Sequence, residues 1–265
     1  MNSTHKDSII ELKSVTVTYP HHTALESVSL AIREKEFVGI AGPNGAGKTT
    51  LLCAINGLSH ILCGTVRVFG KSLFSHIASI RKDIGYVPQI IACDPRIPLR
   101  VREVVSMGRY ARINFLKRFS AEDRNIVEDA AEVVGISRLM DRPIGHLSGG
   151  EQRKVAIARA LTQEPKILLL DEPVSHLDLN AQAAISALIE KVHTEKNLTT
   201  IMVSHQLDLL PESCNRLILL KEGKIIFTGA TQEGLKEDIL SRLYGCPVKI
   251  IKNGGGCAIR VGTHF

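Results

Sequence analysis

Short apolar runs alternate with segments of helical character along most of the chain. Residues 36–41, 166–172 and 199–204 each contain a short apolar run with polar residues at one or both ends, a pattern typical of buried strands. Helices are predicted between these runs, over residues 50–56 and 180–196. Strands that alternate with helices in this way predict a parallel sheet with helices on both faces.

Two regions depart from this alternation. Residues 9–32 contain two alternating, β-branched segments separated by Pro20 and two histidines, which predicts an antiparallel ribbon beside the core. Residues 100–160 carry few strand signals, and Ser120 to Asp123 has the form of a capping box that begins a helix. We therefore expect a small helical lobe, from about residue 90 to residue 160, inserted in the core.

The last part of the chain predicts a β-hairpin over residues 216–227 and one further strand over residues 248–251. Glycines at positions 254–256 indicate a loose turn in this tail. The pattern assigns no function to residues 241–265, which we treat as a C-terminal tail.

The most informative stretch is the loop between the strand at 36–41 and the helix at 50–56. It fits the phosphate-loop pattern G-x-x-x-x-G-K-[ST] with Gly42, Pro43, Asn44, Gly45, Ala46, Gly47, Lys48 and Thr49. Glycines allow the backbone to wrap a triphosphate with its N–H groups directed inward. Lys48 supplies a positive charge for the β- and γ-phosphates, and Thr49 supplies a hydroxyl for Mg²⁺. The flanking strand and helix favour this reading over a Gly-rich turn with a surface lysine.

Polar residues follow three other predicted strands, at the edge where a parallel sheet binds ligands. The amide oxygen of Gln89 suits Mg²⁺ or an attacking water, although an ordinary turn residue is the alternative. Asp171 is placed to reach the Mg²⁺ shell and Glu172 to orient or activate water, against the alternative of a plain strand end. His205 suits donation to a γ-phosphate, and a structural histidine is its alternative.

Two further segments suggest contacts with a nucleotide. Tyr19 ends a predicted strand just before a turn, where its ring is able to stack on a purine, but the pattern alone favours a packing tyrosine. Ser148 caps a predicted helix together with Glu151. Gly149 and Gly150 leave N–H groups open at that positive helix end, which forms either a second anion site or an ordinary capped start.

Charge leaves several partners open. The net charge is +6, from 33 basic and 27 acidic residues, which is compatible with a nucleotide pocket, nucleic acid or a membrane surface. Four basic residues gather near the middle of the chain, and we interpret them as a solvated face. They are Arg109, Arg112, Lys117 and Arg118.

Composition also bears on the compartment. No run approaches the ~20 uncharged apolar residues that a spanning helix needs. Residues 1–7 are polar and lack the apolar stretch of a signal peptide, so we expect the chain itself to be soluble and not secreted. The six cysteines are scattered without a C-x-x-C pair, which favours reduced packing thiols over a metal site.

The order of these segments closely resembles the ATP-binding subunit of ABC transporters, over about residues 9–230. Residues 42–49 match the Walker A motif of that family, residues 147–151 its signature motif, and residues 167–172 its Walker B motif with the catalytic glutamate. The signature just ahead of Walker B is the most specific of these matches. The resemblance implies an α/β fold of the P-loop NTPase (RecA-like) type. Its mostly parallel core carries an N-terminal antiparallel β subdomain and an inserted α-helical subdomain, within residues 1–240.

Smaller motifs match the family as well. Gln89 matches the Q-loop, residues 175–178 the D-loop and His205 the H-loop. Tyr19 matches the aromatic residue that stacks on adenine, which reverses the packing interpretation. His176 departs from the usual Ser-Ala-Leu-Asp of the D-loop, and we expect a small effect because Asp178 is retained.

The resemblance implies ATP and Mg²⁺ as ligands and hydrolysis by two copies arranged head to tail. Each ATP would lie between the Walker A loop of one chain and the signature loop of the other. The implied catalytic residues are Lys48, Gln89, Glu172 and His205, and the implied Mg²⁺ ligands are Thr49, Gln89 and Asp171. The implied nucleotide contacts are Tyr19, Gly42, Pro43, Asn44, Gly45, Ala46, Gly47, Lys48, Thr49, Thr50, Ser148, Gly149, Gly150 and Asp178.

The resemblance also implies partners and a place in the cell. We expect transmembrane permease subunits, an extracytoplasmic substrate-binding protein, no nucleic acid, and a peripheral position on the cytoplasmic face of the membrane. Residues 94–110 and 244–248 resemble segments of importers for metal ions and iron chelates, which favours that cargo class.

Alternatives are an ABC ATPase of another transporter type, a non-catalytic regulatory cassette, or a soluble ABC ATPase acting on ribosomes, DNA or iron–sulfur assembly. The regulatory cassette is disfavoured because every catalytic position is filled. The soluble type is disfavoured because the chain has one cassette and no long coiled-coil insertion.

Overall fold

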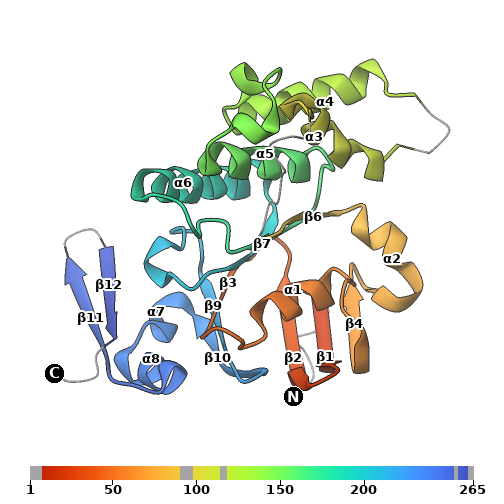
Figure 1. The fold of residues 1–265 in the computed structure, drawn as a ribbon. Helices are drawn as coiled ribbons and strands as arrows, with labels where there is room; N and C mark the ends of the chain where they lie inside the picture. Colours follow the sequence, from red (N-terminus) through yellow and green to blue (C-terminus); the bar gives the residue numbers. More distant parts are fainter. Residues whose placement is uncertain (1–7, 90–97, 114–117, 254–255, 262–265) are drawn as a thin grey trace. The chain divides into compact units, whose positions relative to one another are not determined.

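The computed structural model describes residues 8–89, 98–113, 118–253 and 256–261. The chain divides into two compact units. The first unit consists of residues 1–77 and 199–265, and the second of residues 78–198 (Figure 1). Lys117, residues 94–97 and the first two glycines of the turn predicted at 254–256 lie outside the described residues. Gly256, the third glycine of that turn, begins a strand.

The first unit contains the antiparallel sheet that the alternating N-terminal pattern predicts. Its strand order is β2-β1-β4-β5, with bounds β1 Ser8–Tyr19, β2 His22–Arg33, β4 Ile61–Val68 and β5 Lys71–Ser72. The inward side chains of the ribbon, among them Ile10, Leu12 and Leu25, are buried. Helix α1 (Lys48–Ile55) lies against β1, β2 and β4, so the ribbon packs beside the helix that follows the glycine-rich loop.

A second set of strands in the same unit is mostly parallel. Strand β3 (Phe37–Ala41) pairs in parallel with β8 (Thr199–Val203) on one side and with β9 (Arg216–Lys221) on the other. Strand β10 (Lys224–Ala230) returns antiparallel to β9, as the predicted hairpin requires. All residues of β3 and β8 are buried, in agreement with the apolar sequence of β3 and of residues 201–203 in β8.

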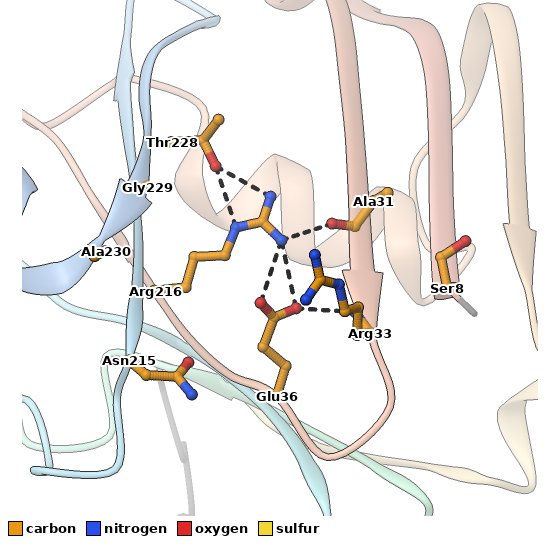
Figure 2. A pocket seen from close by; sticks show the side chains of 9 residues that line it. All are labelled: Ser8, Ala31, Arg33, Glu36, Asn215, Arg216, Thr228, Gly229 and Ala230. Atoms are coloured by element: carbon orange, nitrogen blue, oxygen red, sulfur yellow. Dashed lines mark hydrogen bonds and ion pairs between the residues drawn. The ribbon is translucent and has the colours of Figure 1, made fainter. Parts of the chain in front are cut away.

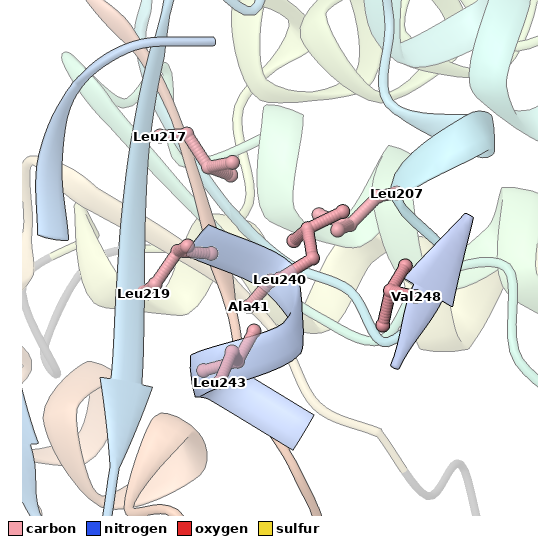
Figure 3. Packing of buried hydrophobic residues seen from close by; sticks show 7 residues of the cluster. All are labelled: Ala41, Leu207, Leu217, Leu219, Leu240, Leu243 and Val248. Atoms are coloured by element: carbon pink, nitrogen blue, oxygen red, sulfur yellow. The ribbon is translucent and has the colours of Figure 1, made fainter. Parts of the chain in front are cut away.

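The C-terminal segment packs onto this sheet. It comprises α7 (Thr231–Gly234), α8 (Glu237–Tyr244), β11 (Val248–Asn253) and β12 (Gly256–Val261), the last of which the sequence did not predict. Figure 3 shows Leu240 and Leu243 of α8 and Val248 of β11 beside Leu217 of β9 and Leu207. Leu207 begins the short 3₁₀ turn η4 (Leu207–Leu209), so the tail covers the turn that follows β8.

The second unit contains a parallel strand pair and most of the helices. Strand β6 (Ile84–Val87) pairs in parallel with β7 (Ile167–Asp171), and every residue of β7 is buried. The predicted helical lobe is present (Figure 1). The helices are α3 Val101–Ser106, η1 Met107–Ala111, α4 Ala121–Val133, η2 Ser137–Leu139, η3 Ile144–His146, α5 Gly149–Leu161 and α6 Leu179–Lys196. Helix α2 (Leu73–Arg81) spans the junction of the two units in sequence.

The start of helix α1 differs from the sequence prediction. Helix α1 begins at Lys48 rather than at Thr50, because the first helical turn already includes the end of the loop. None of the helices in the described ranges is both long enough and apolar enough to cross a membrane.

The interpretation of the mid-chain basic residues as a solvated face is wrong for Arg109 and Arg112. Arg109 is 8% exposed, and its guanidinium donates to Asp123 at 2.9 Å and to Glu164 at 2.6 Å. Arg112 donates to Asp83 at 2.6 Å. Asp123 and Glu164 lie 14 and 55 positions from Arg109, and Asp83 lies 29 positions from Arg112. A local charge pattern therefore does not predict these ion pairs. Arg118 is exposed, as predicted.

The pairing of Arg109 with Asp123 predicts a pH-dependent stability. Hydrogen bonds from Ser120, followed by the guanidinium of Arg109, lower the pKa of Asp123 to about 2. Because the pKa of an unfolded aspartate is about 3.9, the unfolded chain binds more protons between these values. The contribution of Asp123 is therefore fully present above about pH 4 and is lost as the pH falls towards about 2.

We expect Asp123→Asn to lower the free energy of unfolding by about 3 kcal/mol at pH 7, because Arg109 then lacks a buried counter-charge. The difference from the wild type should shrink as the pH falls below about 4. Urea unfolding followed by circular dichroism measures this in a chain without tryptophan. Asp129→Asn, an exposed aspartate on the same helix, is the control, and equal losses in the two variants would contradict the assignment.

Candidate active site

The glycine-rich loop connects β3 to α1 in the first unit and has a backbone that side chains do not tolerate. Gly42 has φ +156° and Gly47 has φ +97°. A Cβ atom on Gly42 would lie 2.1 Å from the carbonyl oxygen of Leu220, and one on Gly47 would lie 2.4 Å from that of Ala24. Two glycines of the motif are therefore required by the protein's own backbone, before any ligand is considered.

Lys48 holds the loop closed. Its Nζ donates to the carbonyl oxygens of Gly42 at 2.9 Å and Pro43 at 3.0 Å, and the residue is only 6% exposed. At the start of α1, the N-cap residue Gly47 has no side chain to cap the first turn, and no acidic residue lies in that turn. The positive helix end and the buried ammonium group together form a cradle that fits an anion. Within the loop, Asn44, Gly45 and Thr49 are exposed.

His205 lies close to this loop because of strand pairing within the first unit. Its neighbour Ser204 donates its backbone N–H to the carbonyl oxygen of Ile40 at 3.0 Å, which places the end of β8 beside the end of β3. The hydroxyl of Ser204 also accepts from the N–H of Gln206 at 3.0 Å and donates to its carbonyl oxygen at 2.8 Å. This turn holds the backbone on both sides of His205, whose side chain is exposed.

Tyr19 ends β1 with its ring partly open to solvent. It is 45% exposed, and one face stacks on His22 across the turn, with ring centroids 5.4 Å apart and planes inclined by 27°. The pairing of Tyr19 with His22 in the β1–β2 ribbon brings the two rings together. A half-exposed aromatic ring held by a second ring suits a stacking surface better than a packing role.

The second unit brings Gln89 and Glu172 together. The Nε2 of Gln89 donates to Oε2 of Glu172 at 2.8 Å. Both residues follow the carboxyl ends of the parallel strands β6 and β7, where Val87 pairs with Leu170. Glu172 is 9% exposed and has φ +46°, a conformation that costs a non-glycine residue ~1–2 kcal/mol and is common at functional sites. Asp171, the last residue of β7, is 1% exposed.

Ser148 begins α5 with the predicted capping box. Its hydroxyl accepts from the N–H of Glu151 at 3.3 Å, and the carboxylate of Glu151 accepts from the N–H of Ser148 at 2.8 Å. The cap leaves Gly149 and Gly150 at the first two helical positions, whose N–H groups have no acceptor within a helix. The capped helix start that the sequence suggested is therefore present. The cap does not exclude an anion site, because the N–H groups of the first turn remain available.

The glycines at the start of α5 also pack closely on the loop after β7 and on the start of α6. A Cβ atom on Gly149 would lie 3.2 Å from a methyl group of Leu177, and one on Gly150 would lie 3.2 Å from Cβ of Ala181. Asp178 caps α6 by accepting the N–H of Ala181 at 2.8 Å. A role as helix cap therefore accompanies any contact that Asp178 makes with a ligand.

Arg153 is a residue of this region that the sequence did not single out. It lies on α5 and is 6% exposed, and its two terminal nitrogens donate to the carbonyl oxygens of Pro88 at 2.9 Å and Gln89 at 3.1 Å. Burial lowers the pKa of Arg153, and the charges of Asp171 and Glu172 oppose that shift. The sequence pattern around a basic residue in an amphipathic helix predicts a solvent-exposed side chain, so no local signal reveals that Arg153 is buried.

A pocket of about 510 Å³ lies at the opposite edge of the first unit's parallel strands (Figure 2). Arg216, at the start of β9, lies at its centre. Its guanidinium donates to the carbonyl oxygen of Ala31 at 2.8 Å and to the hydroxyl of Thr228 at 3.1 and 3.2 Å, and it pairs with Glu36 at 3.4 Å. These bonds connect β9 with β2 and β10, so Arg216 has a structural role here.

The sequence-predicted residues fall into two groups. The first unit carries Tyr19, Gly42, Pro43, Asn44, Gly45, Ala46, Gly47, Lys48, Thr49, Thr50 and His205. The second unit carries Gln89, Ser148, Gly149, Gly150, Asp171, Glu172 and Asp178. Apart from Tyr19, which ends the antiparallel strand β1, these residues lie at carboxyl ends of parallel strands or at helix starts, which are the positions where α/β proteins bind anions.

Comparison with known proteins identifies relatives of the whole chain. A model of the ABC transporter family matches residues 25–175. The manganese transport system ATP-binding protein MntB of Bacillus subtilis is 36% identical over 92% of this chain and 95% of its own length. The chelated iron transport system membrane protein YfeB of Yersinia pestis is 37% identical over 91% of this chain and 81% of its own length.

A solved structure agrees with these relatives. The dimeric structure of MJ0796, a bacterial ABC transporter cassette, aligns with a TM-score of 0.74 and 32% identity over 84% of this chain and 98% of its own. The same cassette is known in a post-hydrolysis state bound to ADP and Pi, and it aligns there with 31% identity. The α/β fold predicted from the sequence is thereby confirmed.

The loop glycines make distinct predictions for stability without nucleotide. We expect Gly42→Ala to lower the free energy of unfolding by about 3 kcal/mol, because a strand carbonyl occupies the space that the methyl group needs. Gly45→Ala should lower the free energy of unfolding by only about 1 kcal/mol. The loss comes from backbone strain at its φ of +77°, since no non-neighbouring atom lies within 4 Å of the Cβ position. Chemical unfolding measures both values, and equal losses would show that the loop backbone is more compliant than the structure indicates.

Proposed function

The chain belongs to the ABC transporter family, and from this premise we propose that it is the ATP-hydrolysing subunit of an importer for a metal ion or a metal chelate. The observation that best supports hydrolysis is the hydrogen bond between Gln89 and Glu172 at the end of β7. It holds a buried carboxylate at the strand edge where a family with this loop handles triphosphates.

The loop of the first unit would hold the triphosphate of ATP. The N–H groups from Gly45 to Thr50 and the positive end of α1 suit its oxygens, and Lys48 suits the β- and γ-phosphates. Lys48 already donates to two loop carbonyls, so its ammonium group is held in place before ATP binds. The exposed ring of Tyr19 would stack on adenine.

The residues proposed for Mg²⁺ carry oxygen donors of the kind that this ion prefers. They are the hydroxyl of Thr49, the carboxylate of Asp171 and the amide oxygen of Gln89, whose Nε2 is engaged with Glu172. When bound, Mg²⁺ supplies charge neutralisation to the phosphate oxygens. This donor set therefore fits the ion.

Glu172 would act on the attacking water. Its carboxylate oxygen accepts a proton or a hydrogen bond from that water, while Gln89 fixes the orientation of the carboxylate. His205 would donate to the γ-phosphate, where negative charge is concentrated in the transition state. In this scheme positioning and charge stabilisation supply most of the rate enhancement, because phosphoryl transfer to water needs little covalent help from a protein.

Two copies of the chain would complete each site. We assign the start of α5 to the ATP that is held by a second copy arranged head to tail. The groups available for this contact are the hydroxyl of Ser148 and the N–H groups of Gly149 and Gly150. The similar cassette MJ0796 is known as a dimer, which supports the pairing of two copies. Asp178 would join this interface while it caps α6.

The transport assignment rests on the relatives. One is named for manganese transport and another for chelated iron transport, and both are similar over nine-tenths of this chain. We propose that permease subunits bind the chain at the cytoplasmic face of the membrane and that an extracytoplasmic substrate-binding protein delivers the cargo. No residue described here would touch the cargo itself.

The isosteric change Glu172→Gln tests the hydrolytic assignment. We expect ATP binding within about twofold of the wild type and hydrolysis slower by on the order of 100- to 1000-fold, because the amide does not accept a proton. Size-exclusion chromatography with ATP should show the variant accumulating as a dimer. Lys48→Met is the control that loses ATP binding. Undiminished hydrolysis by Glu172→Gln, or full activity of a strictly monomeric form, would refute the proposal.

Fractionation and metal uptake test the transport assignment. The chain should co-purify with a polytopic membrane protein, and deletion of its gene should lower the accumulation of manganese, zinc or iron in cells starved of that metal. The wild-type gene should restore uptake, whereas the Lys48→Met gene should not. Recovery of all the protein in a soluble fraction with nucleic acid would instead favour a soluble ABC ATPase.

A further inference from the structure

Arg153 occupies the centre of a series of contacts in the second unit. Its Nη1 and Nη2 donate to the carbonyl oxygens of Pro88 and Gln89, at 2.9 and 3.1 Å. The side chain of Gln89 in turn donates to Glu172 at 2.8 Å. A guanidinium that grips two consecutive carbonyls fixes both the position and the direction of the backbone that carries Gln89, because its planar fork leaves little rotational freedom.

The position of Arg153 carries a large desolvation penalty. The residue is 6% exposed, and within the described part of the chain its Nε is buried without a hydrogen-bond partner. A buried charge of this kind is costly unless opposite charge lies nearby. Asp171 and Glu172 provide that charge, since they are the groups that raise the pKa of Arg153 against the effect of burial. The cation therefore lies within the electrostatic reach of both carboxylates at the end of β7.

We propose that Arg153 is a positioning residue for ATP hydrolysis, which holds the Pro88–Gln89 backbone so that the Gln89 amide orients the carboxylate of Glu172. This inference rests on the proposed role of Glu172. Arg153 touches neither ATP nor water in this scheme. It acts through Gln89, and its loss changes how often the carboxylate of Glu172 points in the productive direction.

Helix α5, which carries Arg153, connects these contacts with the capped turn at Ser148. Helix α5 begins at the capped turn of Ser148, and Arg153 lies between that turn and the backbone of Gln89. A displacement of α5 would therefore pull on the carbonyls of Pro88 and Gln89. The groups assigned to the nucleotide of a second copy and the group assigned to hydrolysis are thus joined by α5, Arg153 and Gln89 in one chain.

Steady-state hydrolysis and equilibrium binding of ATP test this inference in the full chain. We expect Arg153→Met to lower kcat by on the order of 10- to 100-fold, because misplacement of a reacting group has effects of that size. The Kd for ATP should stay within about twofold, since the phosphate loop lies in the other unit. Arg153→Lys keeps the charge without the two-pronged grip and should show an intermediate kcat, so it carries the test if Arg153→Met does not fold.

Arg159→Met is the matched control. Arg159 lies on the same helix, burial lowers its pKa as well, and within the described residues it has no hydrogen bond to Pro88 or Gln89. Its replacement should leave kcat within about twofold. An equal fall of kcat in the Arg159 and Arg153 variants would overturn the inference, because the effect would then belong to packing of the helix.

A double-mutant cycle separates positioning from general destabilisation. If Arg153 acts through Gln89, Arg153→Met should cause no further loss of kcat in a Gln89→Ala background, whereas independent effects multiply. Multiplying losses, or an unchanged kcat in Arg153→Met, would overturn the inference. The variant Glu172→Gln, measured in the same assay, separates the proposed hydrolytic function from the proposed role of Arg153. If that variant hydrolyses ATP normally, the proposed function fails, and if it is inactive while Arg153→Met is normal, only the role of Arg153 fails.

Discussion

The exclusion of side chains from the loop after β3 is the constraint on which the first unit depends. The carbonyl oxygens of Leu220 and Ala24 occupy the places where side chains of Gly42 and Gly47 would begin. One carbonyl belongs to β9 and the other to β2, so the loop is enclosed by both sheets of the unit. Its shape is therefore set by strand pairing far away in sequence, and Lys48 closes it from within.

In the second unit, the main constraint is the burial of charged side chains. Arg109 has two carboxylates at hydrogen-bond distance, those of Asp123 and Glu164, so its buried positive charge is fully compensated as long as both partners remain. Arg153 instead uses backbone carbonyls for its hydrogen bonds and more distant carboxylates for its charge balance. The second arrangement leaves the carboxylates of Asp171 and Glu172 without a direct hydrogen bond to the guanidinium among the described contacts.

Local pattern predicts what is local. The apolar runs of β3, β7 and β8, the capping box at Ser148 and the glycine-rich loop are all readable from a few neighbouring residues, and the structure contains each of them. The burial of Arg109 and Arg153 was not predictable, because their partners lie on segments that only the folded chain brings near. Strand β12 was missed for the same reason, since its pairing with β11 and not its composition makes it a strand.

The turn after β7 shows why the groups of the second unit act together. The carbonyl oxygen of Glu172 accepts from both the N–H and the hydroxyl of Ser175, so the backbone of Glu172 is held from the side of the following loop. That loop continues to Leu177, which packs against Gly149 at the start of α5. Glu172 is thus connected to the start of α5 along two routes, by its backbone through this loop and by its side chain through Gln89 and Arg153. The helix start that we propose to bind an anion and the carboxylate that we propose to act on water therefore belong to one hydrogen-bonded and packed assembly, and movement of either requires the other to adjust.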